Sequence, residues 1–248
     1  NMPLRRVVDS TVAGVYRIID NRLDPGQEMP VLERLSGDLA FTHKDINAKD
    51  LSAQLLGQPA SLGVQSGPGG RVTLSVDGRM DPRGLATWVP EPLLRHLKGV
   101  TSYRAEIALQ QQQTDLRIES DLKGLTIDLP EPLGKPAERP ETLLFTHGRN
   151  DAGQTAILAK YGQVLSARAV FGKPGEQPSI SLLIGQGEAR APRNPGLTLE
   201  AAQGRLNLDP WLALADEQGG GDLRINTVTL TANELILFDR LFTGTQVI

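Results

Sequence analysis

The sequence contains no cysteine among its 248 residues. Disulfide bonds and thiolate metal sites are therefore excluded, although the absence of cysteine leaves the cellular compartment open. Aromatic residues make up only 4% of the chain, so large aromatic anchors are scarce. The apolar residues are mostly Leu, Val, Ile and Ala spread evenly along the chain, which suits a long thin sheet better than a globular core.

Long apolar runs and clusters of one charge are also missing. No stretch approaches the roughly 20 consecutive apolar residues of a membrane span. No signal peptide is visible, because Arg5 and Arg6 precede a segment that Asp9 and Arg17 interrupt. The net charge is −3, and acidic and basic residues are interspersed. This pattern argues against a nucleic-acid partner and against a basic patch for lipid headgroups.

The dominant positive signal is an apolar residue at every second position, as in a strand with one buried face. It is clearest in residues 72–76, 103–109, 116–122 and 180–184. Turn signals separate such segments at residues 67–70, 150–153, 173–175 and 219–221. We therefore predict an all-β chain of about twelve strands, arranged as an antiparallel meander.

Three segments depart from the strand pattern. Residues 82–97 and the segment that begins at Asp209 and Pro210 are predicted to form two short helices. Residues 130–141 contain four prolines and are predicted to form an extended connection. This connection is a possible division between a first half-sheet, residues 1–130, and a second, residues 141–248, of one repetitive β structure.

Catalytic and metal-binding patterns are not found. The three histidines, His43, His96 and His147, lie in separate segments without ligand spacing. Asp115 and Glu119 share a strand face with Arg117 between them, which is typical of a solvated face rather than of a carboxylate pair. We therefore predict no catalytic residues, no metal, no cofactor and no enzymatic activity.

The most distinctive stretch is residues 120–135, hereafter the signature segment, which reads Ser-Asp-Leu-Lys-Gly-Leu-Thr-Ile-Asp-Leu-Pro-Glu-Pro-Leu-Gly-Lys. It resembles a signature of the YhdP branch of the AsmA-like family, Ser-Asp-Leu-x-Gly-Leu-x-x-x-Leu-Pro-x-Pro-Leu-x-Lys. Residues 35–41, 53–57, 97–100 and 206–211 are also similar to segments of that family. The resemblance covers roughly residues 10 to 240.

The resemblance implies a fold and a function. Members of the family are anchored in the inner membrane, cross the periplasm as a long, curved, half-open β-sheet or half-pipe, and are implicated in phospholipid transport to the outer membrane. The chain is then expected to be an interior piece of such a periplasmic bridge. Its expected partners are phospholipid acyl chains and the flanking segments of the same protein, with membrane contact only through regions outside this sequence.

Under this hypothesis the alternating apolar side chains line an open groove. The expected lining residues are Val72, Leu74, Val76, Tyr103, Ile107, Leu109, Leu116, Ile118, Leu122, Ile180 and Leu182. Three alternatives stay open at this point. The same alternation builds a closed sandwich core, an adaptor domain that binds other envelope proteins through sheet edges, or a hydrolytic β-domain, which needs converging carboxylates.

Overall fold

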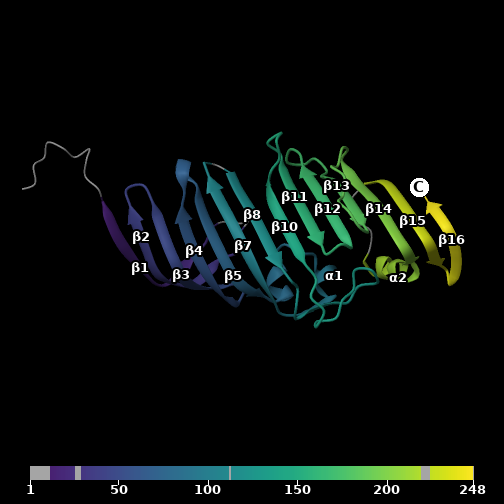
Figure 1. Ribbon diagram of the computed structural model, residues 1–248, viewed down its shortest axis with the longest axis horizontal. Helices are drawn as coiled ribbons and strands as arrows, with labels where there is room; N and C mark the ends of the chain where they lie inside the picture. The colour runs from purple at the N-terminus through teal and green to yellow at the C-terminus, as the bar shows by residue number, and fades with distance from the viewer. Residues whose placement is uncertain (1–11, 26–28, 112, 219–223, 248) are drawn as a thin grey trace, which may run out of the picture. The chain divides into compact units, whose positions relative to one another are not determined.

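A computed structural model describes residues 12–25, 29–111, 113–218 and 224–247 (Figure 1). The predicted turn at residues 219–221 lies outside them. Fourteen strands form one sheet that is not closed into a barrel, in the order β1-β2-β3-β4-β5-β7-β8-β10-β11-β12-β13-β14-β15-β16. The all-β prediction, with its mostly antiparallel open sheet, is confirmed.

The strands of the first part are β1 (Ala13–Leu23), β2 (Leu32–Thr42), β3 (Ile46–Leu55), β4 (Gln58–Ser66), β5 (Val72–Met80), β7 (Thr101–Gln110) and β8 (Gln113–Ser120). Those that follow are β10 (Leu143–Arg149), β11 (Thr155–Tyr161), β12 (Leu165–Phe171), β13 (Ser179–Ile184), β14 (Gly196–Asn207), β15 (Ile225–Leu237) and β16 (Arg240–Val247). A separate small sheet pairs β6 (Leu97–Gly99) with β9 (Leu125–Ile127).

The antiparallel meander is interrupted near the C-terminus, where β14 runs parallel to both β13 and β15. A parallel pair needs a connection that returns to the same end of the sheet. Residues 185–195 provide it between β13 and β14, and helix α2 (Asp209–Gln218) lies in the connection between β14 and β15. The predicted antiparallel meander describes most of the sheet but does not extend to these two pairs.

One of the two predicted helices is present as a helix, and the other is broken into shorter elements. The helix expected from Asp209 and Pro210 is present as α2. Residues 82–97 are broken into a 3-10 helix, η3 (Pro82–Leu85), and a single turn, α1 (Glu91–Leu94), because prolines at positions 90 and 92 interrupt the helical hydrogen bonds. A third short element, η2 (Pro68–Gly70), joins β4 to β5.

The chain divides into two compact units, described separately below. Unit 1 is Asn1–Arg79 with Arg104–Thr114, and unit 2 is Met80–Tyr103 with Asp115–Ile248. The strands on either side of the Pro-rich connection, β8 and β10, pair directly with each other. The division of the chain at residues 130–141 stays a prediction.

Unit 1 contains bulges in three neighbouring strands. The register shifts between Ile18 and Asn21, between Glu33 and Ser36, and between Ala48 and Leu51. Asp20, Arg34 and Asp50, one in each shift, have φ values of 51, 53 and 57°. Bulges bend a strand and increase its twist, so β1, β2 and β3 all change direction at corresponding places.

In unit 2 the signature segment folds around a buried lysine. Lys135 is only 3% exposed, and its ammonium donates hydrogen bonds to the backbone oxygens of Leu122 (2.9 Å), Leu125 and Pro136 (3.0 Å). All three of its donors are therefore used. Burial lowers the pKa of Lys135 from its ordinary value, with a smaller contribution from the charge of Arg139.

The connection after this segment is not extended as predicted. Ile127 and Lys135 exchange backbone hydrogen bonds of 2.9 Å, and the Gly124 amide donates to the Ala137 oxygen at 2.8 Å. The close packing needs glycine at position 134, where a Cβ would lie 2.2 Å from the Leu129 oxygen. Proline removes a backbone N–H donor but does not prevent the chain from turning back on itself. The four prolines therefore did not indicate an extended connection.

We expect Lys135→Met to lower the free energy of unfolding by about 2 kcal/mol, because backbone oxygens in a buried position lose a charged donor. The measurement is urea denaturation followed by tryptophan fluorescence, since both tryptophans, Trp88 and Trp211, lie in unit 2. Lys123→Met, at an exposed lysine of the same segment, is the control and should change little. Equal stability of the Lys135 and Lys123 variants would contradict this role of Lys135.

Candidate functional site

One face of the sheet in unit 2 is apolar from β8 to β14. Residues directly opposite each other on neighbouring strands share a face, and the register places Ile118, Phe145, Ala159, Ala167, Leu182 and Leu199 in one row across six strands. The next row is formed by Leu116, His147, Ile157, Ala169, Ile180 and Leu197. These two rows are hereafter the apolar face, and all twelve side chains in them are half-buried.

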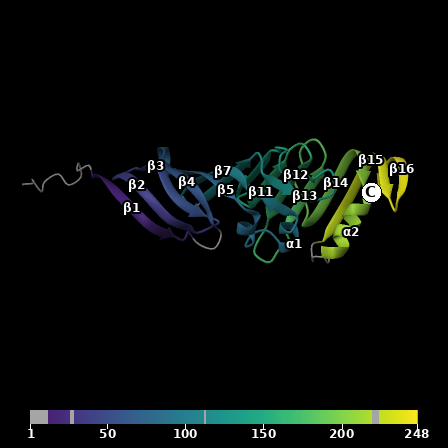
Figure 2. The same ribbon diagram turned by 90° about the horizontal axis from the view of Figure 1, so that it is seen from below.

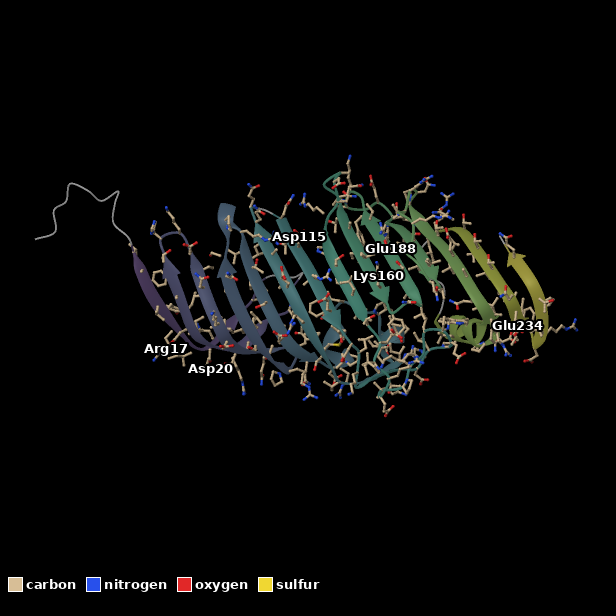
Figure 3. The ribbon with its side chains drawn as sticks, in the orientation of Figure 1. Arg17, Asp20, Asp115, Lys160, Glu188 and Glu234 are labelled. Atoms are coloured by element: carbon tan, nitrogen blue, oxygen red, sulfur yellow. The ribbon has the colours of Figure 1, made fainter. Side chains whose placement is uncertain are left out.

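The opposite face of the same strands is polar. It presents Lys160, Ser166 and Arg168, and the connection from β13 to β14 lies over it. In this connection Glu188 forms ion pairs with Lys160 and, at 2.8 Å, with Arg168, while the Ala189 amide donates to the Ser166 hydroxyl at 2.9 Å. Figure 3 shows Lys160 and Glu188 close together. The two faces of this part of the sheet therefore differ in chemistry.

One end of the apolar rows is covered. Tyr161 is buried together with Leu122 and Leu125 of the signature segment, and Leu143 and Leu165 pack against this cluster. Leu143, Tyr161 and Leu165 stand directly opposite one another at the ends of β10, β11 and β12. We call this the covered end of the apolar face and the opposite end of the same strands the far end.

Helix α2 is tied to the element that covers this end. The Trp211 indole donates a hydrogen bond to the Glu131 oxygen at 3.1 Å. The Asp209 carboxylate accepts hydrogen bonds from the Phe238 and Asp239 amides, at 2.6 and 2.9 Å, in the turn between β15 and β16. In Figures 1 and 2, α1 and α2 lie along one edge of the strands of unit 2. The helices and the signature segment thus border the covered end.

The structure brings several predicted lining residues of unit 2 together. Leu116, Ile118, Ile180 and Leu182 lie on the apolar face. The Thr101 hydroxyl lies 3.3 Å from that of Ser120, which places Tyr103, two residues further along β7, on the same side as Ile118. Burial raises the pKa of Tyr103 to about 12. Leu122 is instead enclosed in the cluster at the covered end.

The predicted residues of unit 1 also share one face of their strands. Val72, Leu74 and Val76 stand opposite Ser66, Val64 and Leu62 of β4. Arg104 bonds Asp77 at 2.9 Å on the other face, so Ile107 and Leu109 lie on the face of Val76. Val76 and Ile107 are buried, whereas Leu109 is 38% exposed.

Sequence reasoning missed several residues of the apolar face. These are Leu143 at the covered end and, in the two rows, Phe145, Ile157, Ala159, Ala167 and Ala169. The reason is that β10, β11 and β12 also carry Leu144, Leu158 and Val170 on the polar face, which conceals the alternation. The available signal was the single charged residue of each strand, Lys160 in β11 and Arg168 in β12, which marks the polar face.

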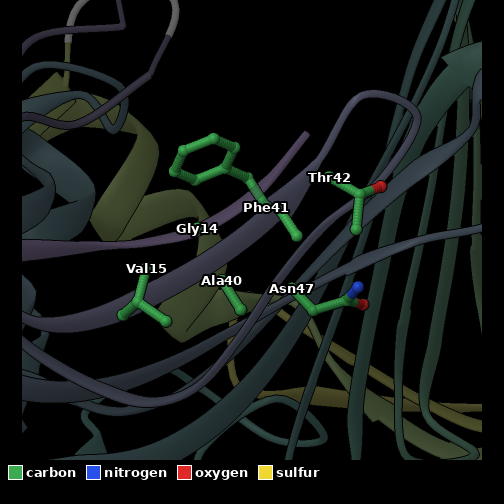
Figure 4. Close-up of a pocket in the computed structure, with 7 residues that line it drawn as sticks. Gly14, Val15, Ala40, Phe41, Thr42 and Asn47 are labelled. Atoms are coloured by element: carbon green, nitrogen blue, oxygen red, sulfur yellow. The ribbon is translucent and has the colours of Figure 1, made fainter. Parts of the chain in front are cut away.

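Unit 1 has a shallow pocket of about 400 Å³ at β1, β2 and β3 (Figure 4). It is lined by Ala13, Gly14, Val15, Ala40, Phe41, Thr42 and Asn47. The register places Val15, Ala40 and Asn47 on one face. The lining offers no titratable side chain, so it suggests an apolar contact rather than a reaction.

Groups for metal chemistry are not found where the structure describes the chain: no three His, Asp or Glu side chains gather as a possible ligand set. His96 contacts the backbone oxygen of Asp128 at 2.9 Å, and His147 lies in the apolar face. No helix within the described ranges is long and apolar enough to cross a membrane.

The chain is similar in sequence to known proteins. The family profile described as "YhdP protein" matches residues 1–247. A curated relative from Escherichia coli (strain K12), the "Intermembrane phospholipid transporter YhdP", is 25% identical over 117 residues. That match covers 44% of this chain and 9% of the relative's length. No solved structure matches significantly.

We expect Glu188→Gln to lower the urea midpoint of unfolding at pH 7, because Lys160 and Arg168 lose their anionic partner. The hydrogen bond from Lys160, followed by its charge, holds the pKa of Glu188 below its ordinary value of 4.5. Its stabilising effect is therefore complete above pH 4.5 and is lost as the pH falls through the lower pKa of the folded state.

The control is Glu138→Gln, at an exposed carboxylate that forms no ion pair in the described part of the chain. The difference between Glu188→Gln and the unaltered chain should shrink in high salt and vanish at acid pH. A difference that stays constant down to pH 3 would exclude the ion pairs as its cause.

Proposed function

Because the chain belongs to the YhdP family, we propose that it is a stretch of a phospholipid-transporting protein and that its apolar face shields acyl chains from water. The observation that carries the proposal is the row of Ile118, Phe145, Ala159, Ala167, Leu182 and Leu199, which stays apolar across six strands. A lipid that moves across the strands would meet no charged side chain in this row.

The energetics favour such a path. Keeping one methylene group out of water is worth about 0.8 kcal/mol, so an acyl chain gains from any continuous apolar lining. The residues of the apolar face are half-buried rather than sealed in a core, so they retain surface for a ligand. The sheet is open, which weighs against the closed sandwich that the same alternation allows.

The proposal extends to the rest of the expected lining and to the surroundings. In unit 1 the face of Val72, Leu74, Val76, Ile107 and Leu109 would provide the same kind of lining. The chain would act in the periplasm, within a protein anchored in the inner membrane. Flanking segments of that protein are its proposed neighbours at the ends of the sheet.

An alternative role is an adaptor that binds other envelope proteins through a sheet edge. The observation in its favour is β1, where Val15 and Ile19 are 66% and 71% exposed. Exposed apolar residues on an end strand are a liability unless another strand covers them. A flanking segment of the same protein satisfies this requirement equally well, so the transport role is preferred.

Leu182 and Leu183 offer a matched pair for testing the role. They are consecutive half-buried leucines of β13, and only Leu182 is on the apolar face. A photo-crosslinking amino acid at position 182 of the full-length protein should capture phospholipid in bacterial cells, detected by mass spectrometry of the adduct. The same amino acid at position 183 should capture little or none. Equal capture at both positions, or capture only at 183, would refute the assignment of the lipid path to the apolar face.

A further inference from the structure

We propose that the far end of the apolar face binds the phosphate of a phospholipid headgroup through Arg149, with His147 and Thr155 beside it. This inference rests on the function proposed above and adds the position and orientation of the lipid. It starts from the order of side chains along β10.

The side chains of β10 on this face change in polarity along the strand. Leu143 is packed in the covered end, Phe145 and His147 follow on the apolar face, and Arg149 is exposed at the far end. Positions two apart in a strand are about 7 Å apart and face the same way. Along its length, β10 therefore changes on this face from a buried apolar side chain, Leu143, to an exposed cationic one, Arg149.

The neighbouring strand repeats this order. Tyr161 lies in the covered end, Ala159 and Ile157 follow, and Thr155 stands directly opposite Arg149. Directly opposed residues have Cβ atoms about 5 Å apart, so the guanidinium and the hydroxyl can reach one ligand. In contrast, β12 presents Phe171 at this end, opposite Thr155. The proposed site is therefore centred on the hairpin of β10 and β11.

The donors at this place are largely unused. Within the described residues the Arg149 guanidinium makes one long hydrogen bond, 3.4 Å, to the Gly153 oxygen, although it has five N–H donors. His147 is half-buried among apolar neighbours, and its imidazole makes no hydrogen bond to any described residue. Arginine is well suited to bidentate contacts with phosphate oxygens.

The nearby acidic groups do not neutralise this site. Asp115 lies on the polar face, where its Oδ1 would be 2.5 Å from a Cβ at Gly148. Asp151 is in the turn that follows Arg149, and it is exposed.

A phospholipid has hydrocarbon tails at one end and a phosphate at the other, and the side chains of this site follow the same order. The tails of the lipid would therefore point to the covered end and its phosphate to Arg149.

The test measures binding of two fluorescent lipids with identical acyl chains to the purified 248-residue chain by anisotropy. One probe is phosphatidylglycerol, and the other is diacylglycerol, which lacks the phosphate. Arg149→Ala should weaken binding of phosphatidylglycerol about tenfold, the value of a charge-assisted hydrogen bond, and leave diacylglycerol binding unchanged. Arg149→Lys should recover part of the loss. Arg117→Ala, on the polar face of β8, should change neither.

The remaining outcomes separate the two proposals. If the unaltered chain binds neither lipid, the proposed function fails and this inference fails with it. If both lipids bind and Arg149→Ala weakens neither or both equally, only the headgroup site is overturned. A third outcome is that inorganic phosphate binds to the chain while phosphatidylglycerol binds no more tightly than diacylglycerol. Arg149 would then hold free phosphate and not a lipid headgroup, and the headgroup site would be overturned.

Discussion

The register between neighbouring strands is the constraint on which the rest of this structure depends. Side chains alternate between the faces of a strand, so a shift by one residue would move every apolar group of that strand to the polar face. From β8 through β10, β11 and β12 to β13 the pairing runs without a register shift, and Ile118, Ala167 and Leu182 consequently share a row. The parallel pairing of β13 with β14 keeps Leu182 opposite Leu199, so the change of direction does not break the row.

Two local structures support this register in unit 2. On the polar face, Glu188 holds Lys160 and Arg168 of adjacent strands from the connection that passes over them. At the covered end, the buried Lys135 fixes the signature segment, which places Leu122 and Leu125 against Tyr161. The signature segment therefore lies at the covered end of the proposed lipid path, and backbone contacts hold it in shape.

Much of the sheet is predictable from the sequence, because Ile180 and Leu182 alternate with Ser179 and Ser181, and period two is then unmistakable. The alternation is hidden where both faces of a strand carry apolar residues, as at Leu158 in β11. The sequence therefore identified only part of the apolar face of unit 2. Bulges at Arg34 and Asp50 carry no distinctive local residue pattern, and the parallel pairs depend on contacts distant in sequence. The role of Lys135 likewise depends on carbonyls that only the folded chain brings together.

The central claim is that the apolar face of unit 2 holds acyl chains. Its most direct test is mass spectrometry of lipid extracted from the chain after expression in bacteria and purification without detergent. The unaltered chain should carry phospholipid, and a variant with Ile180, Leu182 and Leu199 changed to Ser should carry far less. A matched variant with Leu144, Leu158 and Leu183 of the polar face changed to Ser should retain it. Lipid loss from the second variant but not the first, or no lipid in the unaltered chain, would contradict the claim.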